Sequence, residues 1–134
     1  MKDTLIDTDT LSYYFKQKTE VANRVEFYLL TKGFLNISLM TYYEVLHGFY
    51  YRDAQKQLAT FETFLQLHNI VPLNKEIAKV SATIHADLRK KGLTIGYNDT
   101  LIAETAIVRN MVLITNNIAH YSRIEGLEID NWSL

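Results

Sequence analysis

The sequence of 134 residues has no cysteine, a single proline and only five glycines. The absence of cysteine excludes a disulfide scaffold, a thiolate zinc site and a cysteine nucleophile. With so little proline and glycine there is no flexible linker, low-complexity segment or internal repeat. The length suits one domain, so we expect residues 1–134 to form a single unit.

An excess of positive charge is also missing, because the formal net charge is −1. The sequence therefore lacks the basic footprint that is typical of nucleic-acid-binding proteins, and any such contact must come from local groups. No stretch approaches the roughly 18 apolar residues of a membrane helix. The first residues, MKDTLIDTDT, carry acids where a secretory signal needs an apolar run, so we expect a cytoplasmic protein.

What the sequence does contain is 48% hydrophobic residues, arranged as short apolar runs that alternate with longer amphipathic segments. This pattern predicts strands at 4–6, 35–38, 70–71, 111–114 and 128–130, and helices at 11–15, 21–31, 40–51, 54–67, 75–91 and 99–109. Strands that are separated by helices pair in parallel, so the predicted fold class is a layered α/β sandwich.

Polar residues gather where the predicted strands end. Asp7 directly follows the first strand, Glu44 lies on the helix after the second, and Asp99 opens the helix before the fourth. Thr115 and Asn117 come directly after the fourth strand. Because ligands of α/β sheets bind beyond the carboxyl ends of the strands, we expect these side chains to meet at one edge.

Clustered carboxylates repel one another and raise each other's pKa, and a divalent cation relieves that repulsion. Glu44 shares a helical stripe with Met40 and with Gly48, which leaves open space beside its carboxylate. Mg²⁺ prefers such oxygen ligands and can support hydrolysis of a phosphodiester. The spacing therefore indicates a metal site formed by acids from distant segments.

Each acid also has a purely structural interpretation. Asp7 and Asp9 can cap the helix that begins near Thr10, and Asp99 or Asn98 can cap the helix that follows them. Glu44 can be an exposed helix residue. The spacing alone leaves these alternatives open.

Four segments resemble the PIN-domain ribonucleases, and in particular the VapC toxins of bacterial toxin–antitoxin pairs. They are LIDTDTLSYYF, ISLMTYYEVLHG, KGLTIGYNDTLIAETAI and LITNNIAHYSRIEGLEIDNW. They follow the order and spacing of the family and cover the chain nearly end to end. The last two are most similar to the VapC branch that cuts initiator tRNA.

The resemblance implies a PIN-like three-layer α/β/α sandwich around a central, mostly parallel sheet of four to five strands. It implies that Asp7, Glu44 and Asp99 bind Mg²⁺ or Mn²⁺ and, with Asn117, catalyse cleavage of an RNA phosphodiester. The resemblance to the initiator-tRNA branch implies that this RNA is initiator tRNA. Asp9, Thr115, Ser38 and Thr41 are the supporting residues. Two positions depart from the family pattern: Asn117 stands where many PIN domains have a fourth acid, and Asp9 where the family usually has asparagine.

The resemblance also implies a homodimer and a VapB-type antitoxin whose tail occupies the acidic site. We expect the tyrosines at 42, 43, 50 and 51 to form an interface, and the four histidines to be structural or exposed. The RNA-contact candidates are Lys16, Lys18 and Arg52, whose elements start at the acidic edge. We place the run 89–91 away from the site.

Two other function classes compete with a metal-dependent ribonuclease. A non-catalytic PIN module would bind RNA or protein without cutting, although the complete acid set argues against it. A phosphoacceptor domain of the flavodoxin-like class also clusters acids at strand ends. Such a domain needs a lysine after its last strand, whereas no lysine follows TNNIAHYS.

Overall fold

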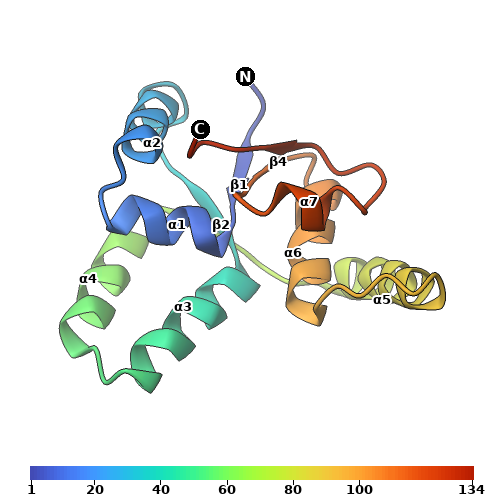
Figure 1. Cartoon of the computed structure of the whole chain (residues 1–134). Coiled ribbons are helices and arrows are strands. Elements are labelled where there is room, and N and C mark those ends of the chain that lie inside the picture. Colours follow the sequence, from blue (N-terminus) through green and yellow to red (C-terminus); the bar gives the residue numbers. More distant parts are fainter.

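The computed structural model describes residues 1–134 and has short parallel strands at its centre (Figure 1). The strands are β1 (Thr4–Ile6), β2 (Asn36–Ser38), β3 (Asn69–Val71), β4 (Val112–Ile114) and β5 (Ile129–Asp130). The helices are α1 (Thr8–Phe15), α2 (Thr19–Lys32), α3 (Leu39–Tyr51), α4 (Gln55–Leu65), α5 (Lys75–Lys90), α6 (Tyr97–Val108) and α7 (Ile118–Tyr121).

Every strand pairing is parallel, as the alternation of strands and helices predicts. Ladder hydrogen bonds join β1, β4 and β5 in one sheet and β2 with β3 in another. β2 lies beside β1, where the side-chain amide of Asn36 donates to the carbonyl oxygen of Thr4 at 3.1 Å. The strands therefore run in the order β3–β2–β1–β4–β5, with the ladder interrupted between β2 and β1.

Alternate residues of the strands face two separate apolar cores. Ile6 and Ile114 pack with side chains of α1, α2 and α4, whereas Leu5 and Leu113 pack with those of α5, α6 and α7. This alternation follows from the pleat of a strand and gives the expected three-layer α/β/α arrangement. In Figure 1, α1 to α4 lie on one side of the strands and α5 to α7 on the other.

All the helices and strands that the sequence predicts are present, with ends shifted by up to three residues. The first turns start earlier than predicted: α1 begins at Thr8 and α6 at Tyr97. The short helix α7 was not predicted. None of the helices is both long and apolar enough to cross a membrane.

The parallel arrangement brings the carboxyl ends of β1, β2 and β4 to one edge. The amide of Asp7 donates to the carbonyl oxygen of Ile114 at 2.9 Å, which holds the ends of β1 and β4 together. Helices α1 and α3 start directly after β1 and β2, and α6 ends before β4. Residues at the starts of these helices therefore converge on the same region.

Candidate active site

Asp7 is the most buried carboxylate of this edge, with 6% of its surface exposed. As the N-cap of α1 it accepts a hydrogen bond from the amide of Thr8 at 2.9 Å, and Thr115 donates its hydroxyl to the other carboxylate oxygen at 2.8 Å. Burial, and then the negative charge of Asp9, raise the pKa of Asp7 to about 7. Its charge is therefore poorly compensated by the protein alone.

Thr115 is fully buried and follows β4 just as Asp7 follows β1. Its oxygen also accepts from the backbone amide of Asn117 at 3.0 Å. The side chain of Asn117 is exposed and forms no hydrogen bond with the acids. Asp9 accepts from the amide of Asn116 at 3.1 Å, so its carboxylate ties α1 to the loop after β4.

Glu44 lies one turn into α3 and is half-buried. Thr8 donates its hydroxyl to the Glu44 carboxylate at 2.7 Å and lies 3.0 Å from the hydroxyl oxygen of Thr41. Ser38 caps α3 by accepting from the amide of Thr41 at 3.0 Å. Ser38 and Thr41 therefore fix the start of α3, and Thr8 connects Glu44 to α1 next to Asp7.

Asp99 sits in the first turn of α6 and is about one-third exposed, at 34% of its side-chain surface. Its two oxygens contact α7: Nε2 of His120 lies 2.9 Å from one, and Tyr121 donates its hydroxyl to the other at 3.2 Å. The N-cap of α6 is Gly96, which has no side chain to cap with. Asp99 and Asn98 are therefore not the caps of this helix.

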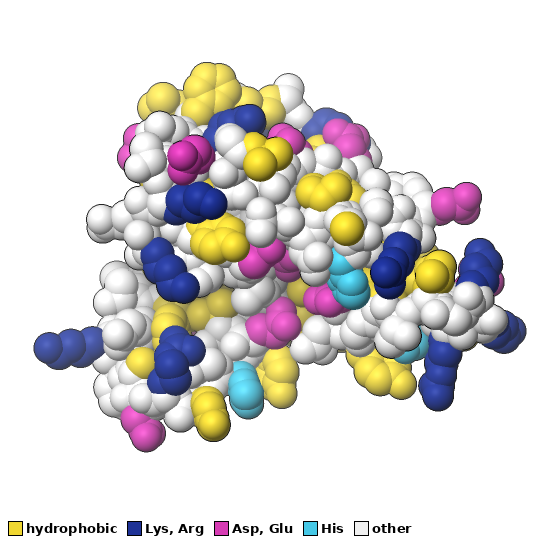
Figure 2. All heavy atoms as spheres, in the orientation of Figure 1, with side chains coloured by type: hydrophobic (Ala, Val, Ile, Leu, Met, Phe, Trp, Pro, Cys, Tyr) yellow, Lys and Arg dark blue, Asp and Glu magenta, His cyan; other side chains and the backbone are white.

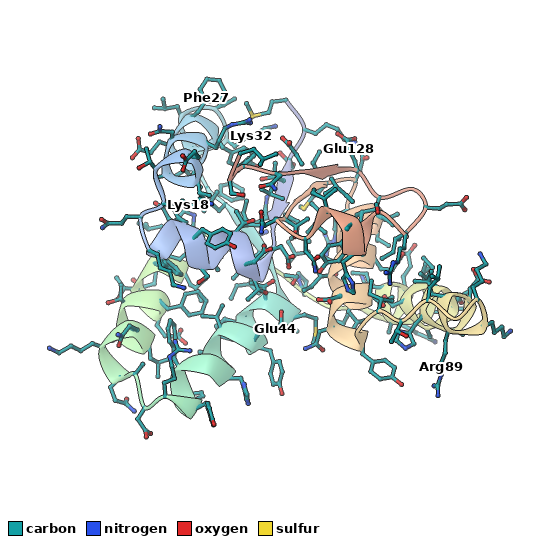
Figure 3. All side chains as sticks on the ribbon, in the orientation of Figure 1. Lys18, Phe27, Lys32, Glu44, Arg89 and Glu128 are labelled. Carbon is teal, nitrogen blue, oxygen red and sulfur yellow. The ribbon has the colours of Figure 1, made fainter.

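The hydroxyl of Tyr121 contacts Asp99, and it lies within the electrostatic influence of Asp7 and Glu44 as well. The side chain is 1% exposed. Burial raises the pKa of Tyr121, and the negative charges of Asp7, Asp99 and Glu44 raise it further. Acidic side chains gather at the centre of the face in Figure 2, and Figure 3 shows Glu44 at that centre, between α1 and α3.

Thr8 thus connects Asp7 with Glu44, and Tyr121 contacts Asp99 while the charges of all three acids act on it. Asp9 and Thr115 contact the loop after β4 and Asp7, respectively, and Ser38 caps the helix of Glu44 by binding the amide of Thr41. The structure holds no preformed cluster of three His, Asp or Glu side chains close enough to grip a metal ion. Each carboxylate is instead held by a hydroxyl or a ring nitrogen of the protein. The donor set still consists of oxygens, and burial, with the negative charge of Asp9, raises the pKa of Asp7, so a cation beside it would favour its ionised form.

A cleft of about 700 Å³ leads away from Glu44 between α1, α3 and α4. Lys16 and Arg52, two of the predicted RNA contacts, line it together with Lys56. Arg52 lies over the ring of Phe49, with 5.4 Å from its guanidinium carbon to the ring centroid. A Cβ at Gly48 would come within 3.3 Å of Arg52, so the space left by this glycine serves the arginine.

Two further residues singled out from the sequence lie apart from these groups. Lys18 does not line this cleft, and its ammonium lies 4.7 Å from the centroid of the Tyr13 ring. Tyr42 is half-buried, stacks on Phe61 and donates its hydroxyl to Glu62 at 3.1 Å. The tyrosines at 43, 50 and 51 are exposed.

Three residues of the site escaped the sequence reasoning: Thr8, His120 and Tyr121. His120 was interpreted as structural or exposed, although it contacts Asp99. The resemblance could have indicated His120 and Tyr121, because both lie in the matching segment LITNNIAHYSRIEGLEIDNW. Thr8 adjoins Asp7, but its hydroxyl contact with Glu44 spans 36 positions and depends on the fold.

Comparison with known proteins gives one consistent result. The family model of the PIN domain matches residues 4–127. The tRNA(fMet)-specific endonuclease VapC of Salmonella typhimurium is 30% identical over 96% of this chain and 96% of its own length. Ribonuclease VapC1 of Haemophilus influenzae is 30% identical over 96% of this chain and 97% of its own.

Solved structures show the same relationship. A chain of VapBC2 from Rickettsia felis, bound to a DNA fragment from its promoter, superposes with a TM-score of 0.86. It is 28% identical, and the match covers 96% of this chain and 98% of that one. The similarity therefore extends over nearly the whole of both chains.

Proposed function

From the premise that this chain belongs to the PIN-domain family and to its VapC ribonucleases, we propose that its acidic edge cuts RNA. The chain is the toxin of a type II toxin–antitoxin pair and an endoribonuclease, and it forms a single PIN domain over residues 1–134. The observation that carries this proposal is the set of contacts at the edge: Thr8 contacts both Asp7 and Glu44, and Asp99 contacts Tyr121, whose hydroxyl is influenced by all three acids.

The substrate we propose is initiator tRNA, cut in its anticodon region, because the Salmonella relative is named for that specificity. Lys16 and Arg52 would hold backbone phosphates, since both line the cleft that starts at Glu44. Lys18 would contribute less from outside this cleft. We place the activity in the cytoplasm, where tRNA is found.

Asp7, Glu44 and Asp99 are the residues that would hold Mg²⁺ or Mn²⁺. A bound cation would stabilise negative charge on the phosphate and favour ionisation of the attacking water. Thr115 and Thr8 hold the Asp7 carboxylate, Tyr121 and His120 orient Asp99, and Thr8 orients Glu44. The side chain of Asn117 forms no hydrogen bond with the acids, and we propose that it acts through the loop that carries it.

The raised pKa of Asp7 has a chemical consequence. With a pKa of about 7, this carboxyl is roughly half protonated at neutral pH. A metal ligand must give up its proton, so metal binding should release a proton from Asp7 and strengthen with pH. Asp9 adds negative charge beside it, and this explains how aspartate at that position can strengthen the site.

The partners follow from the same relationship. We propose a VapB-type antitoxin that blocks the acidic edge with its tail, and a homodimer of this chain. The solved relative from Rickettsia felis is a VapBC complex. The exposed tyrosines of α3, at 43, 50 and 51, are the candidate dimer surface.

Cleavage of a purified initiator tRNA transcript tests the proposal, with Mg²⁺ or Mn²⁺ and with EDTA. We expect Asp7→Asn and Asp99→Asn to abolish cleavage while far-UV circular dichroism stays unchanged. The matched control is Asp87→Asn, an exposed carboxylate of α5 that pairs only with Lys91. If wild type binds the tRNA but never cleaves it with either metal, the chain is a non-catalytic PIN module instead.

A further inference from the structure

A second groove lies on the other side of the acidic edge, between α5 and α6. Its volume is about 620 Å³. Alanines of α5 leave it open, Tyr97 and Thr100 line it from α6, and Arg89 and Lys90 line it near the end of α5. The site described above uses none of these side chains.

One wall of the groove is an exposed aromatic pair. Tyr97 is 69% exposed, and its ring stacks on His85 with 4.2 Å between the ring centroids and 18° between the planes. The His85 ring is itself held at 3.4 Å from the hydroxyl oxygen of Thr100. A flat aromatic surface fixed from behind and open in front can accept the face of a nucleobase.

The groove also contains a buried polar group that has no partner. Ser81 is 4% exposed and lines the groove, yet its hydroxyl forms no hydrogen bond. A buried hydroxyl without a partner is costly, and a ligand that supplies a donor or acceptor removes this cost. This second observation distinguishes the groove from a gap that small side chains merely leave open.

The position of the groove connects it with the acids. Tyr97 and Asp99 occupy the same first turn of α6, and Thr100 follows Asp99 directly. No side chain caps this helix at Gly96, so its first amides remain available to an anion such as a phosphate. A strand of RNA can therefore pass from the acidic edge over the start of α6 into the groove.

We propose that the α5–α6 groove binds a nucleotide of the RNA substrate that flanks the scissile phosphate. Its base stacks on Tyr97, and Arg89 and Lys90 contact the adjoining phosphates. Figure 3 shows Arg89 on α5, on the opposite side of Glu44 from Lys18. This inference rests on the proposed ribonuclease function and changes the expected path of the RNA, because we had placed residues 89–91 away from the site.

Charge and shape favour RNA over other occupants. The groove is lined by two cations and no carboxylate, whereas the chain as a whole has a net charge of −1. Stacking on an aromatic ring together with Arg and Lys contacts to phosphate is the usual chemistry for single-stranded nucleic acid. The acidic edge then has a basic cleft on each side, with Lys16 and Arg52 in one and Arg89 and Lys90 in the other.

Steady-state cleavage of the tRNA transcript by Tyr97→Ala and Tyr97→Phe separates stacking from structure. We expect Tyr97→Ala to raise KM at least fivefold, about 1 kcal/mol, and Tyr97→Phe to stay near wild type. The Kd for the same tRNA, measured by fluorescence anisotropy in an Asp7→Asn background, should rise equally. Stabilisation by Mn²⁺ should be unchanged in Tyr97→Ala, which would show that Asp99 still holds its place.

Charge reversal can be compared at two pairs of cationic residues on α5, one pair that lines the groove and one that does not. Arg89→Glu with Lys90→Glu should raise KM at least tenfold. Lys75→Glu with Lys79→Glu makes the same change in net charge at exposed positions outside the groove. This control pair should have at most a twofold effect at moderate salt.

The lack of native cysteine permits a direct block of the groove. A bulky maleimide on Ala82→Cys, which lines the groove, should raise KM, whereas the same label on the adjacent exposed Thr83→Cys should not.

Unchanged KM and Kd in Tyr97→Ala and labelled Ala82→Cys would overturn the proposal while leaving the nuclease function intact. A disulfide-linked dimer through Ala82→Cys would also overturn it, because the groove would then be an interface between copies. Wild type that neither cleaves nor binds tRNA would overturn the proposed function itself, and this inference with it.

Discussion

Replacing Asp7 with asparagine should stabilise the metal-free protein at alkaline pH, although it destroys the proposed metal site. Burial and the neighbouring acids raise the pKa of Asp7 from 3.8 to about 7. At pH 8 the folded protein must hold an ionised carboxylate in a place that disfavours it. The variant has the same shape without the charge.

The size of the effect follows from the pKa difference. Each pKa unit corresponds to about 1.4 kcal/mol, so a rise of roughly three units sets a ceiling near 4 kcal/mol. Asparagine keeps one acceptor for the amide of Thr8 but weakens the bond with Thr115, which costs about 1–2 kcal/mol. We therefore expect a net gain of about 2 kcal/mol at pH 8.

The sign depends on pH. Between the unfolded and folded pKa values, about 4 to 7, the folded wild type retains a proton that the unfolded chain has lost. Wild-type stability attributable to this group therefore falls as pH rises through that window, and is constant above it. The advantage of Asp7→Asn should be absent near pH 4 and complete by pH 8.

Urea unfolding in EDTA measures this difference, with Trp132 as the reporter. Trp132 is the only tryptophan and is buried, so its fluorescence follows loss of the core. Titration of groups that do not interact with Asp7 is common to both proteins and cancels in the difference. Asp99→Asn is the control, because its carboxylate is partly exposed and held by His120 and Tyr121, and its loss should not stabilise. An Asp7→Asn protein that is no more stable than wild type at pH 8, or a gain that does not change with pH, would refute the reasoning.

The other predictions concern the metal and the RNA. Mn²⁺ or Mg²⁺ should raise the melting temperature of the EDTA-treated protein, and differential scanning fluorimetry should show no rise in Asp99→Asn; an equal rise in both would count against this site. Tyr121→Phe removes the hydroxyl that contacts Asp99 and should weaken Mn²⁺ binding about three- to tenfold by calorimetry, with the fold retained. Reversing the charges of Lys16, Lys18 and Arg52 together should slow tRNA cleavage at least tenfold, about 1.4 kcal/mol, and single variants should show that Lys18 contributes least; equal contributions would contradict the cleft as the path of the RNA.

The edge where the acids meet could be predicted because it depends on order along the chain. Residues that directly follow neighbouring parallel strands must lie side by side. β1 and β4 pair in register from Thr4 with Val112 to Ile6 with Ile114, so Asp7 and Thr115 come next to each other. Their hydrogen bond at 2.8 Å is a consequence of that register.

The contacts of Asp99 could not be predicted in the same way. They come from α7, a helix of four residues that is too short to show a periodic pattern. The pairing of Asp99 with His120 and Tyr121 spans 21 and 22 positions and depends on how the loop after β4 returns over α6. The helix starts were also misplaced, because α1 and α6 begin with polar residues before their apolar pattern does.

A net charge of −1 led us to expect that RNA is held by a few local cations. In the structure, a net charge near zero is compatible with a high local density of positive charge. Carboxylates at the centre must repel the RNA backbone until a cation binds, so the protein needs positive charge close by on both sides of them. In the proposed path of the RNA, Lys16 and Arg52 would supply it on the side of α1 and α3, and Arg89 and Lys90 on the side of α5. Acids and bases cancel in the total because their numbers are nearly equal, with 14 Lys and Arg against 15 Asp and Glu. They are nevertheless separated in space, and in the proposed path this separation would direct a phosphate chain across the acids instead of away from them.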